Sequence, residues 1–592
     1  MKVLLQHRRK RLLAAAILVL TSFAANAAGK EKEKAEKSAT ATPIEHLVVI
    51  FQENVSFDHY FATYPVAANP AGEPAFHALP GTPAVNNLAT PLDVEKSFAP
   101  LHGLDLLHAN PTQRIQAGDN VQIPFRLDRN QAATADQSHN YDAEQKAFHG
   151  GAMDLFPQFT GNGDAAAIPP LNTSYLVLGY FDGNTVTAYW NYAQHYALND
   201  NAFGTTFGPS YVGAQNLISG QNNGVVLSNA MPLKKGGSNL DGEVTSDGNG
   251  GITVVSDPQP LGDICSTRGA VAIGGRNVGD LLNEAGVTWG FFQGGFDLTV
   301  VNADGSTGCK RATLSNITGR AYGDYIPHHE PFQYSASTRN MSHARPSSVA
   351  AIGRSLQADG KTPDPANHQY DIHDFFDAVS AGNFPAVSYL KAPAYQDGHA
   401  GYSDPLDEQA FVVHAINFLQ QRPEWAHTLI IIAYDDSDGW YDHQMSPIVN
   451  PSKLKPDASS NVVSNGVAVA GVGDQLNGPG VCDKGTQQGR PMPAAALPGY
   501  DGKPSAQGRC GYGPRLPFLA ISPYARVNHV DHTLIDQTSI LRFIEDNWLH
   551  GRRLTGSFDA LAGPLDNMLD WKKPAAGRLM LDEESGEPAA HK

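Results

Sequence analysis

Two short apolar runs, each ending in a pair of oxygen-bearing residues, constrain this chain more than any other feature. The first run ends at Glu53-Asn54 and the second, nearly 400 residues later, at Asp435-Asp436. Runs of four to eight β-branched and apolar residues are typical of strands that are buried on both faces of a parallel sheet. Such sheets bind ligands beyond the carboxyl ends of their strands. The two runs therefore predict two strands whose ends meet and present three carboxylates and one amide, which suit a hard divalent cation.

The backbone is expected to turn at each pair. Adjacent residues of a straight strand point to opposite faces, so Glu53 and Asn54, or Asp435 and Asp436, cannot both face one ion from within a regular strand. The alternative for either pair alone is a turn or a helix N-cap. Two such pairs at matched strand ends favour the cation site.

The two ends of the chain are expected to lie outside the folded domain. Residues 1–27 have a basic start, an apolar stretch and a small-x-small cleavage site, which are typical of a secretory signal peptide. The apolar stretch is too short to span a bilayer comfortably, so we expect cleavage and no stable membrane span. Residues 28–42 are expected to form a flexible tether, and residues 575–592 a polar tail, around a catalytic domain at 43–574.

The net charge argues against one class of partner. Removal of the signal peptide takes away five basic residues and no acidic one, which changes the formal net charge from -17 to -22. Such an acidic protein is a poor candidate for nonspecific nucleic-acid binding.

Strand-like runs alternate with helical patterns along most of the chain. Expected strands include 287–292, 386–390, 428–433 and 517–522, and expected helices include 278–285, 407–421 and 538–549. This alternation predicts an α/β fold with a doubly wound, mostly parallel sheet flanked by helices. Two stretches, roughly 229–262 and 446–514, have the composition of loop-rich insertions.

Four cysteines are expected to form disulfides because the protein is expected to be exported. They are Cys265, Cys309, Cys482 and Cys510. Three connectivities are possible, of which the sequential one closes the shortest loops. No Cys-x-x-Cys spacing supports zinc or redox chemistry.

Ser210 stands after a Gly-Pro turn and before a segment that can start a helix. A serine there lies near exposed backbone N–H groups and the positive end of the helix dipole, which favour a phosphate and a developing alkoxide. The commoner use of such a serine is a plain N-cap. The Gly-x-Ser-x-Gly pattern of Ser-His-Asp hydrolases is absent here.

Histidines in glycine- and proline-rich loops are further candidates, because loops can present an imidazole ring to a site. His328 and His329 lie beside prolines, His399 lies between glycines, and His139 lies in a polar stretch.

Five motifs, in order over about residues 43–555, resemble the bacterial phosphoesterase family. That family contains nonspecific phospholipases C and the respiratory-burst-inhibiting acid phosphatases, and belongs to the alkaline phosphatase superfamily. The motifs are Glu53-Asn54-Val-Ser-Phe-Asp-His-Tyr-Phe61, Phe207-Gly-Pro-Ser210, His328-His329-x-Pro-Phe-Gln-Tyr334, Asp397-Gly-His399-x-Gly-Tyr-Ser-Asp-Pro405 and Ala433-Tyr-Asp435-Asp436-Ser-Asp-Gly-Trp-Tyr-Asp-His443.

The residues of these motifs resemble those of the acid phosphatases more than those of the phospholipases C. The phospholipases C typically carry threonine where Ser210 stands, and Asp-Glu-His-Gly-Gly where this chain has Asp435-Asp-Ser-Asp-Gly. Val55 replaces the usual arginine and Ala62 the usual glycine. Neither is a metal or nucleophile position of the family, so these departures concern substrate preference more than chemistry.

The resemblance implies a role for each matched residue. It implies an alkaline phosphatase-like fold and one divalent metal ion, of unknown identity, held by Glu53, Asn54, Asp435 and Asp436. Ser210 would be the nucleophile and lie next to the metal. The phosphate pocket would be lined by His139, His328, His329 and His399, one of which would protonate the leaving group.

The expected function is that of an exported, periplasmic or secreted, metal-dependent acid phosphatase that hydrolyses small phosphate monoesters through a phosphoserine. One alternative is a phospholipase C that acts on phosphatidylcholine-type lipids, and assays with both substrate types separate the two. An alternative from another class is an inactive exported binding protein on the same fold. The sequence leaves the oligomeric state open.

Overall fold

The computed structural model describes most of the chain. The expected signal peptide at 1–27 lies outside the described residues, and so does all of the expected tether except residues 40–42. The described residues are 40–91, 106–108, 123–227, 233–234, 237–238, 240–452, 454, 461–464, 467–476, 482, 497–504 and 507–589.

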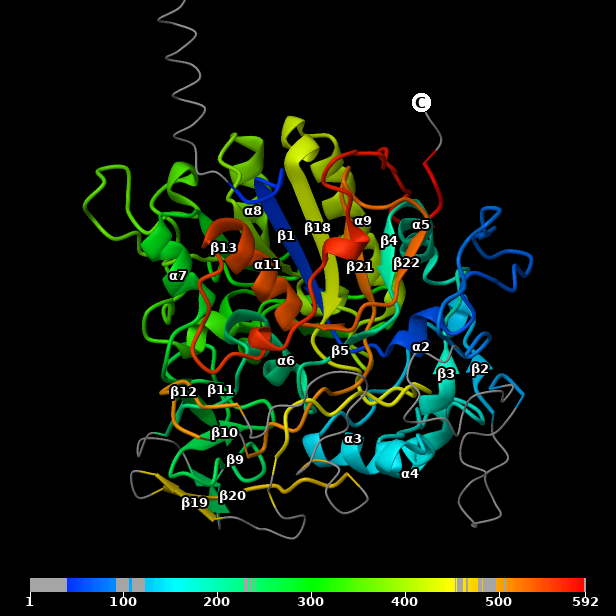
Figure 1. Ribbon diagram of the computed structural model, residues 1–592, viewed down its shortest axis with the longest axis horizontal. Helices are drawn as coiled ribbons and strands as arrows, with labels where there is room; N and C mark the ends of the chain where they lie inside the picture. The colour runs from blue at the N-terminus through cyan, green and yellow to red at the C-terminus, as the bar shows by residue number, and fades with distance from the viewer. Residues whose placement is uncertain are drawn as a thin grey trace, which may run out of the picture.

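An eight-stranded sheet runs through the upper half of the molecule in the view of Figure 1. Its order is β16 (Gln369–Asp371), β13 (Trp289–Gln293), β17 (Val387–Lys391), β1 (His46–Gln52), β18 (Thr428–Tyr434), β21 (Phe518–Ile521), β4 (Ala197–Asn199) and β22 (His529–Asp531). Neighbouring strands are parallel except for β21, which is antiparallel to both β18 and β4.

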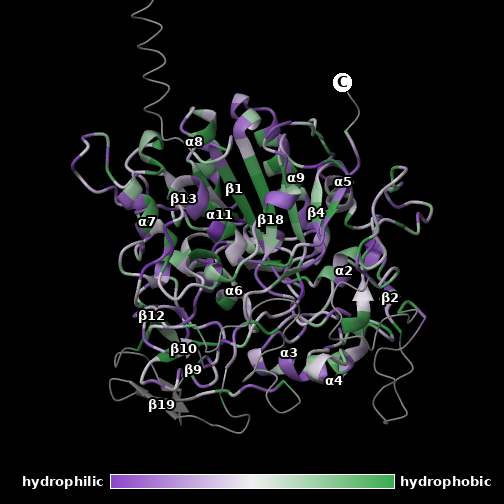
Figure 2. Ribbon diagram, viewed as in Figure 1, coloured by the Kyte–Doolittle hydropathy of each residue, from purple (hydrophilic) through white to green (hydrophobic). Residues whose placement is uncertain are grey.

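The two apolar runs form the central strands β1 and β18. Every residue of β18 is buried, and so is every residue of β1 after its half-buried first residue, His46. Both strands have the hydrophobic colour along most of their length in Figure 2. Burial on both faces explains why these strands are continuous apolar runs rather than alternating patterns.

Helices cover both faces of the sheet. On one face α6 (Ser210–Ser219), α7 (Val278–Ala285) and α11 (Thr538–Trp548) pack against one another. On the other face α9 (Pro405–Gln420) contacts α5 (Thr187–His195), and the Phe376 ring of α8 (Ile372–Ser380) packs edge-on against Phe418 of α9. Figure 1 shows α6 and α11 in front of the sheet and α9 behind it. The predicted α/β fold, with a mostly parallel sheet flanked by helices, is confirmed.

The two predicted insertions lie together below the sheet in Figure 1. The first contains the antiparallel pair β9 (Val244–Ser246) and β10 (Ile252–Val254), and the second contains the hairpin β19 (Asn461–Ser464) and β20 (Val467–Ala470), which contacts β9. Disulfides join Cys265 to Cys309 and Cys482 to Cys510, which is the sequential connectivity.

Residues 575–589, within the expected polar tail, lie against α9. The side chain of Gln420 donates to Leu579 O (2.8 Å), that of Asn417 donates to Leu581 O (2.7 Å), and Leu581 itself is buried. The stretch is polar in composition but ordered by α9.

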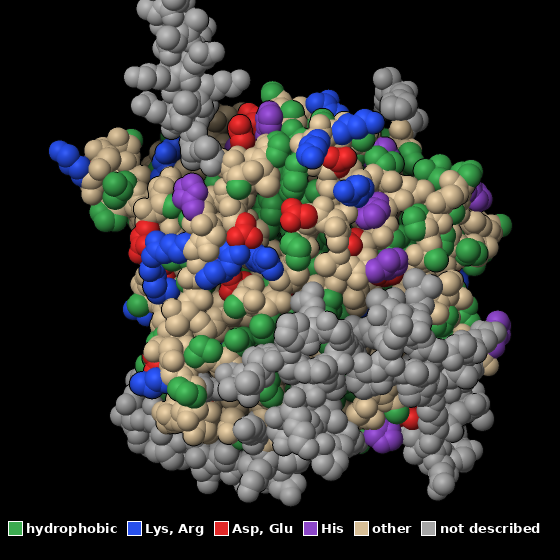
Figure 3. Space-filling model, in the orientation of Figure 1, with side chains coloured by type: hydrophobic (Ala, Val, Ile, Leu, Met, Phe, Trp, Pro, Cys, Tyr) green, Lys and Arg blue, Asp and Glu red, His purple; other side chains and the backbone are tan. Residues whose placement is uncertain are grey.

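The surface in Figure 3 carries basic side chains next to acidic ones. Arg276 and Arg552 both pair with the same carboxylate, that of Glu284. Within the described part of the chain, every helix is too short or too polar to cross a membrane.

Candidate active site

The carboxyl ends of β1 and β18 lie side by side. The strands are parallel neighbours, with Gln52 in register with Tyr434. Glu53 and Asp435 therefore leave the sheet at the same edge. The backbone N–H of Asn54 donates to Asp435 Oδ1 (3.2 Å), which ties the two strand ends together.

The backbone turns at both predicted pairs, as the alternation argument requires. Asn54 has a φ of 57°, in the left-handed region that asparagine tolerates better than most residues. After β18, the Asp435 carboxylate accepts from the N–H of Asp436 (2.7 Å) and the Asp436 carboxylate accepts from the N–H of Asp438 (2.6 Å). These side-chain to backbone bonds are typical of turns built by aspartate.

Ser210 is the first residue of α6 and is buried, which confirms its predicted place at a helix start. Its hydroxyl lies 2.9 Å from Glu53 Oε2, 3.3 Å from Asp436 Oδ2 and 3.5 Å from Asn54 Oδ1. The next backbone N–H, of Tyr211, is not free as the sequence suggested, because it donates to Asp257 Oδ1 (2.8 Å).

A close approach of helix and strand brings Ser210 to this position. Gly213 lies one turn into α6, and a Cβ atom there would lie 2.1 Å from Asp435 O. Only glycine permits this contact without a shift of the backbone.

The converging oxygens fit a divalent cation. Glu53, Asn54, Asp435 and Asp436 are all buried, and Asp435 Oδ2 has no hydrogen-bond partner among the described residues. Without an ion, the opposite orientation of the Asn54 amide makes more hydrogen bonds. Its nitrogen then donates to Glu53 Oε2 (2.8 Å) and Asp435 Oδ1 (2.9 Å), and its oxygen accepts from His399 Nε2 (3.0 Å). An ion would favour the orientation that turns the amide oxygen toward the carboxylates.

The electrostatics of the buried acids also favour a bound cation. Burial, and then the neighbouring charge of Glu53, raises the pKa of Asp435 well above its usual value, and burial followed by the charge of Asp435 does the same for Asp436. Ionised carboxylates this close repel one another, so a cation among them stabilises the charged forms.

Lys391, at the end of β17, already supplies one positive charge. Its buried ammonium group forms an ion pair with Glu53 Oε1 and lies 3.7 Å from Asp435 Oδ2. Burial acts to lower the pKa of Lys391, but these carboxylates outweigh it and the pKa is raised. Sequence reasoning did not identify Lys391, because it appears only as the last residue of an apolar run.

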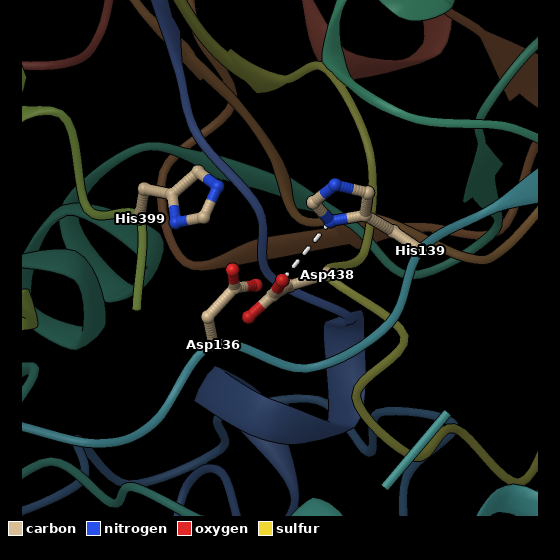
Figure 4. Close-up of side chains that lie close together, drawn as sticks. All are labelled: Asp136, His139, His399 and Asp438. Carbon is tan, nitrogen blue, oxygen red and sulfur yellow. Dashed lines mark hydrogen bonds and ion pairs between the residues drawn. The ribbon is translucent and has the colours of Figure 1, made fainter. Parts of the chain in front are cut away.

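His139 and His399 flank this cluster, with ring centroids 5.8 Å apart. His139 Nδ1 lies 3.0 Å from Asp438 Oδ1, 3.3 Å from Asn54 Nδ2 and 3.6 Å from Asp436 Oδ1. Figure 4 shows the carboxylates of Asp136 and Asp438 beside these two rings. One ligand atom from each of these four residues lies within 4.8 Å of the others, so the group could also hold a metal ion.

His329 lies beside Glu53. His328 lies against His329 and is half-buried. His329 Nδ1 is 3.2 Å from Glu53 Oε1 and 3.8 Å from Asp397 Oδ2, and these three residues form another group that could hold a metal. The ring of His328 lies against that of His329, and its Nδ1 is 3.3 Å from the exposed Arg268 guanidinium. All four predicted histidines thus lie around the strand ends.

The histidine pKa values are displaced downward by burial. Burial is the largest cause for His328, His329 and His139. The second cause is a nearby positive charge: that of Arg268 for His328, of Lys391 for His329 and of His399 for His139. These imidazoles are therefore neutral until the pH falls below the ordinary histidine range.

Glu144 holds two parts of the site together. This buried residue of α3 (Tyr141–Phe148) accepts from Gly208 N–H at Oε2 (3.1 Å) and from Ser437 Oγ at Oε1 (2.8 Å). One carboxyl group thus joins the turn before Ser210 to the turn that carries Asp436. Burial raises its pKa to about 8. No sequence signal marks Glu144, because it stands in an ordinary amphipathic helix.

Several charged motif residues form a separate buried network. Asp58 contacts His443 Nδ1 (2.6 Å) and Arg515 (3.1 Å), and Arg515 also pairs with Asp442 (3.1 Å). The network joins α2 (Phe57–Phe61) to the segment after β18, so these residues support the turns that carry the oxygens.

The chain is similar to one protein family and to several enzymes over most of its length. The model of the phosphoesterase family matches residues 44–549. The chain is 23% identical over 562 residues to a non-hemolytic phospholipase C of Burkholderia pseudomallei (strain K96243), covering 93% of this chain and 62% of that protein. It is 22% identical over 550 residues to phospholipase C A of Mycobacterium tuberculosis (strain ATCC 25618 / H37Rv), covering 91% of this chain and 76% of that protein. The chain therefore spans less than two thirds of the first of these relatives.

Proposed function

Because the chain belongs to the phosphoesterase family, we propose that it is an exported, metal-dependent acid phosphatase that hydrolyses phosphate monoesters through a phosphoserine intermediate. The single observation that carries the proposal is the position of Ser210, whose hydroxyl lies between Glu53 and Asp436 at the start of a helix. An alkaline phosphatase-like, doubly wound topology of the sheet is part of the same proposal.

Five residues would hold one divalent ion: Glu53, Asn54, Ser210, Asp435 and Asp436. A bound ion supplies Lewis-acid stabilisation of the serine alkoxide and of one phosphate oxygen. The buried carboxylates of the set and the orphaned Asp435 Oδ2 support this assignment.

The first half of the reaction transfers the phosphoryl group to the protein. Ser210 Oγ attacks phosphorus as its alkoxide, the bond from phosphorus to the leaving oxygen breaks, and that oxygen takes a proton from one of His139, His328, His329 and His399. The remaining histidines and Arg268 stabilise charge on the other phosphate oxygens. In the second half, water attacks the phosphoserine, the neutral histidine takes a proton from that water, and the bond from phosphorus to Ser210 Oγ breaks, which releases phosphate and restores the serine alkoxide and the protonated histidine.

A phospholipase C is the second candidate. The relatives named above are phospholipases C and match more than nine-tenths of this chain, although at 22–23% identity. Against it stands the serine at position 210, because the resemblance associates threonine with the phospholipases C.

Two assays, run side by side, test the proposal. We expect wild-type protein supplied with a divalent ion to hydrolyse p-nitrophenyl phosphate with a higher kcat/KM than phosphatidylcholine vesicles. The Ser210→Ala variant should lose activity by at least about a thousandfold, whereas Ser210→Thr, which keeps a hydroxyl, should retain part of it. Acid-quenched reactions should carry phosphate on Ser210 by mass spectrometry. Wild-type turnover by Ser210→Ala would refute the covalent mechanism, and preference for the vesicles would select the phospholipase C.

A further inference from the structure

A pocket of about 640 Å³ adjoins the candidate active site. Its walls come from four loops: 134–136, 162–165, the hairpin that carries Arg320 and Tyr322, and 400–402. Hydrogen bonds join these walls. Arg320 Nη1 donates to Gly401 O (2.6 Å), Gly401 N–H donates to Thr134 O (2.8 Å), and Asn162 Nδ2 donates to Asp136 O (3.1 Å). The pocket is therefore preformed.

Two features connect this pocket to the chemistry. Asp136 lines the pocket and also lies in the group with His139 and His399 shown in Figure 4. Three stacked rings lead from solvent to the centre: the Tyr322 ring lies 4.2 Å from that of Tyr402, which lies 4.4 Å from that of His399. His399 in turn lies beside Asn54, which contacts Ser210. Two side chains, His399 and Asn54, thus lie between the pocket wall and the nucleophile.

The lining is polar. Its lining residues carry two carboxylates, one guanidinium, one amide and the hydroxyl groups of Thr134 and Tyr322, and its aliphatic side chains are alanines alone. Tyr402 lines it with its ring, because its hydroxyl donates to Asp397 (3.2 Å). An acyl chain gains nothing from such a wall, because its binding needs apolar area to remove from water. A ligand with many hydroxyl groups matches the alternating donors and acceptors.

An aromatic platform completes the pocket. Tyr322 is 43% exposed although Tyr402 stacks on it, so part of its ring is open to a ligand. A sugar ring or a base can pack on such a ring, and its hydroxyl groups can reach the carboxylates of Asp136 and Asp164.

We propose that this pocket binds the leaving alcohol of the substrate and selects a polyhydroxylated one, such as a sugar or the ribose of a nucleotide, over a diacylglycerol. This inference rests on the proposed function and specifies its substrate class. Tyr322 and Asp164 act as specificity-determining residues at the leaving-group side, while the histidines and Ser210 act on the phosphoryl group.

Steady-state kinetics of Tyr322→Ala and Asp164→Ala test the pocket. The substrates are glucose 6-phosphate, adenosine 5′-monophosphate, p-nitrophenyl phosphate and phosphatidylcholine vesicles. We expect each variant to raise KM for the sugar phosphate and the nucleotide about five- to tenfold, so that the ratio of their kcat/KM to that of p-nitrophenyl phosphate falls. If Tyr322→Ala lowers kcat/KM more for the nucleotide than for the sugar phosphate, Tyr322 stacks on the base. If the two losses are equal, Tyr322 packs on the sugar ring.

Two controls separate specificity from damage. Tyr500→Ala removes a tyrosine of similar exposure, 37%, outside the pocket and should leave the substrate ratios unchanged. Inorganic phosphate lacks a leaving alcohol, so its inhibition constant should stay within about twofold in the pocket variants, whereas a disturbed phosphate site would raise it.

The failures are distinguishable. If wild-type protein hydrolyses none of the four substrates, the proposed function is wrong. If it hydrolyses p-nitrophenyl phosphate but both pocket variants keep wild-type ratios, the pocket assignment alone is overturned. If vesicles are its best substrate, the phospholipase C is selected and the acid phosphatase and the pocket assignment both fail.

Discussion

The ammonium group of Lys391 forms a buried ion pair with the carboxylate of Glu53, at the point where a divalent ion would also be bound. The strand that carries Lys391, β17, is the parallel neighbour of β1. Three adjacent strand ends thus contribute to one cluster, and the protein's own cation offsets part of its negative charge.

Removal of this lysine should strengthen metal binding and lower the folding stability of the metal-free protein. Lys391→Met removes a positive charge next to the ion, so we expect the Kd for a divalent cation to fall about tenfold. Glu53 then lacks its buried partner, which should destabilise the metal-free fold by about 3 kcal/mol. Calorimetric titration and thermal melting with and without metal measure both effects. Lys503→Met, at an exposed ion pair, is the control, and an unchanged Kd contradicts the prediction.

Glu144 should act through the geometry of the site. Glu144→Ala leaves the Gly208 N–H and the Ser437 hydroxyl without their acceptor, and we expect kcat to fall about 10- to 100-fold with a smaller change in KM. Glu144→Gln keeps an acceptor for Gly208 and a donor for Ser437, so it should restore most of the activity. Equal losses in the two variants would contradict the role of Glu144 as a bridge between the two turns.

The metal content depends on the second strand end. Asp435→Asn combined with Asp436→Asn removes two of the three carboxylates, and elemental analysis after dialysis should find less than about a tenth of the wild-type metal. Asp501→Asn, an exposed change, controls for handling. Wild-type metal content in the double variant removes this pair from the coordination sphere.

The pH dependence follows from the lowered histidine pKa values. With His139, His328 or His329 as the acid, the imidazolium exists only below these lowered values, so kcat/KM should fall as the pH rises, with a midpoint below the ordinary histidine value of about 6.5. A pH–rate profile from about pH 4 to pH 8 with p-nitrophenyl phosphate measures this limb. Activity that increases through pH 7 would count against a histidine acid.

Asp58 should contribute stability rather than chemistry. Burial acts to raise its pKa, but His443 and Arg515 outweigh burial and the pKa is lowered. Its contribution is therefore present above the ordinary aspartate value of about 3.9 and is lost as the pH falls through the lowered value. Asp58→Asn should cost about 3 kcal/mol near neutral pH, visible as a lower melting temperature, and the difference from wild type should shrink in acid.

The regular elements were predictable from sequence because their signals are local. The helix at 278–285 has the predicted bounds, and the strands at 428–434 and 518–521 and the helices at 405–420 and 538–548 differ from prediction by a few residues at most. The short edge strands at 369–371 and 529–531 were missed because they are polar and owe their form to pairing with a neighbour.

Site residues could be predicted where they follow a recognisable local sequence pattern. They could not be predicted where their role depends only on contacts in the folded protein. Glu53, Asn54, Asp435 and Asp436 follow apolar runs, and Ser210 follows a Gly-Pro turn, so their grouping could be inferred. Lys391 and Glu144 acquire their roles only from the strands and turns packed around them. The antiparallel direction of β21 likewise depends on connections that no local pattern encodes.

The adjacency of β1 and β18 has a consequence for when the protein becomes active during its synthesis. A nascent chain that ends before residue 428 holds the serine, all four histidines and half of the oxygens, yet it lacks the strand that completes the cluster. Contacts across such a long interval form late, because a long loop must close first. The recovery of turnover during refolding should therefore report the joining of the two halves of the sheet, and under the proposed function we expect no hydrolysis of phosphoesters until most of the chain has been made.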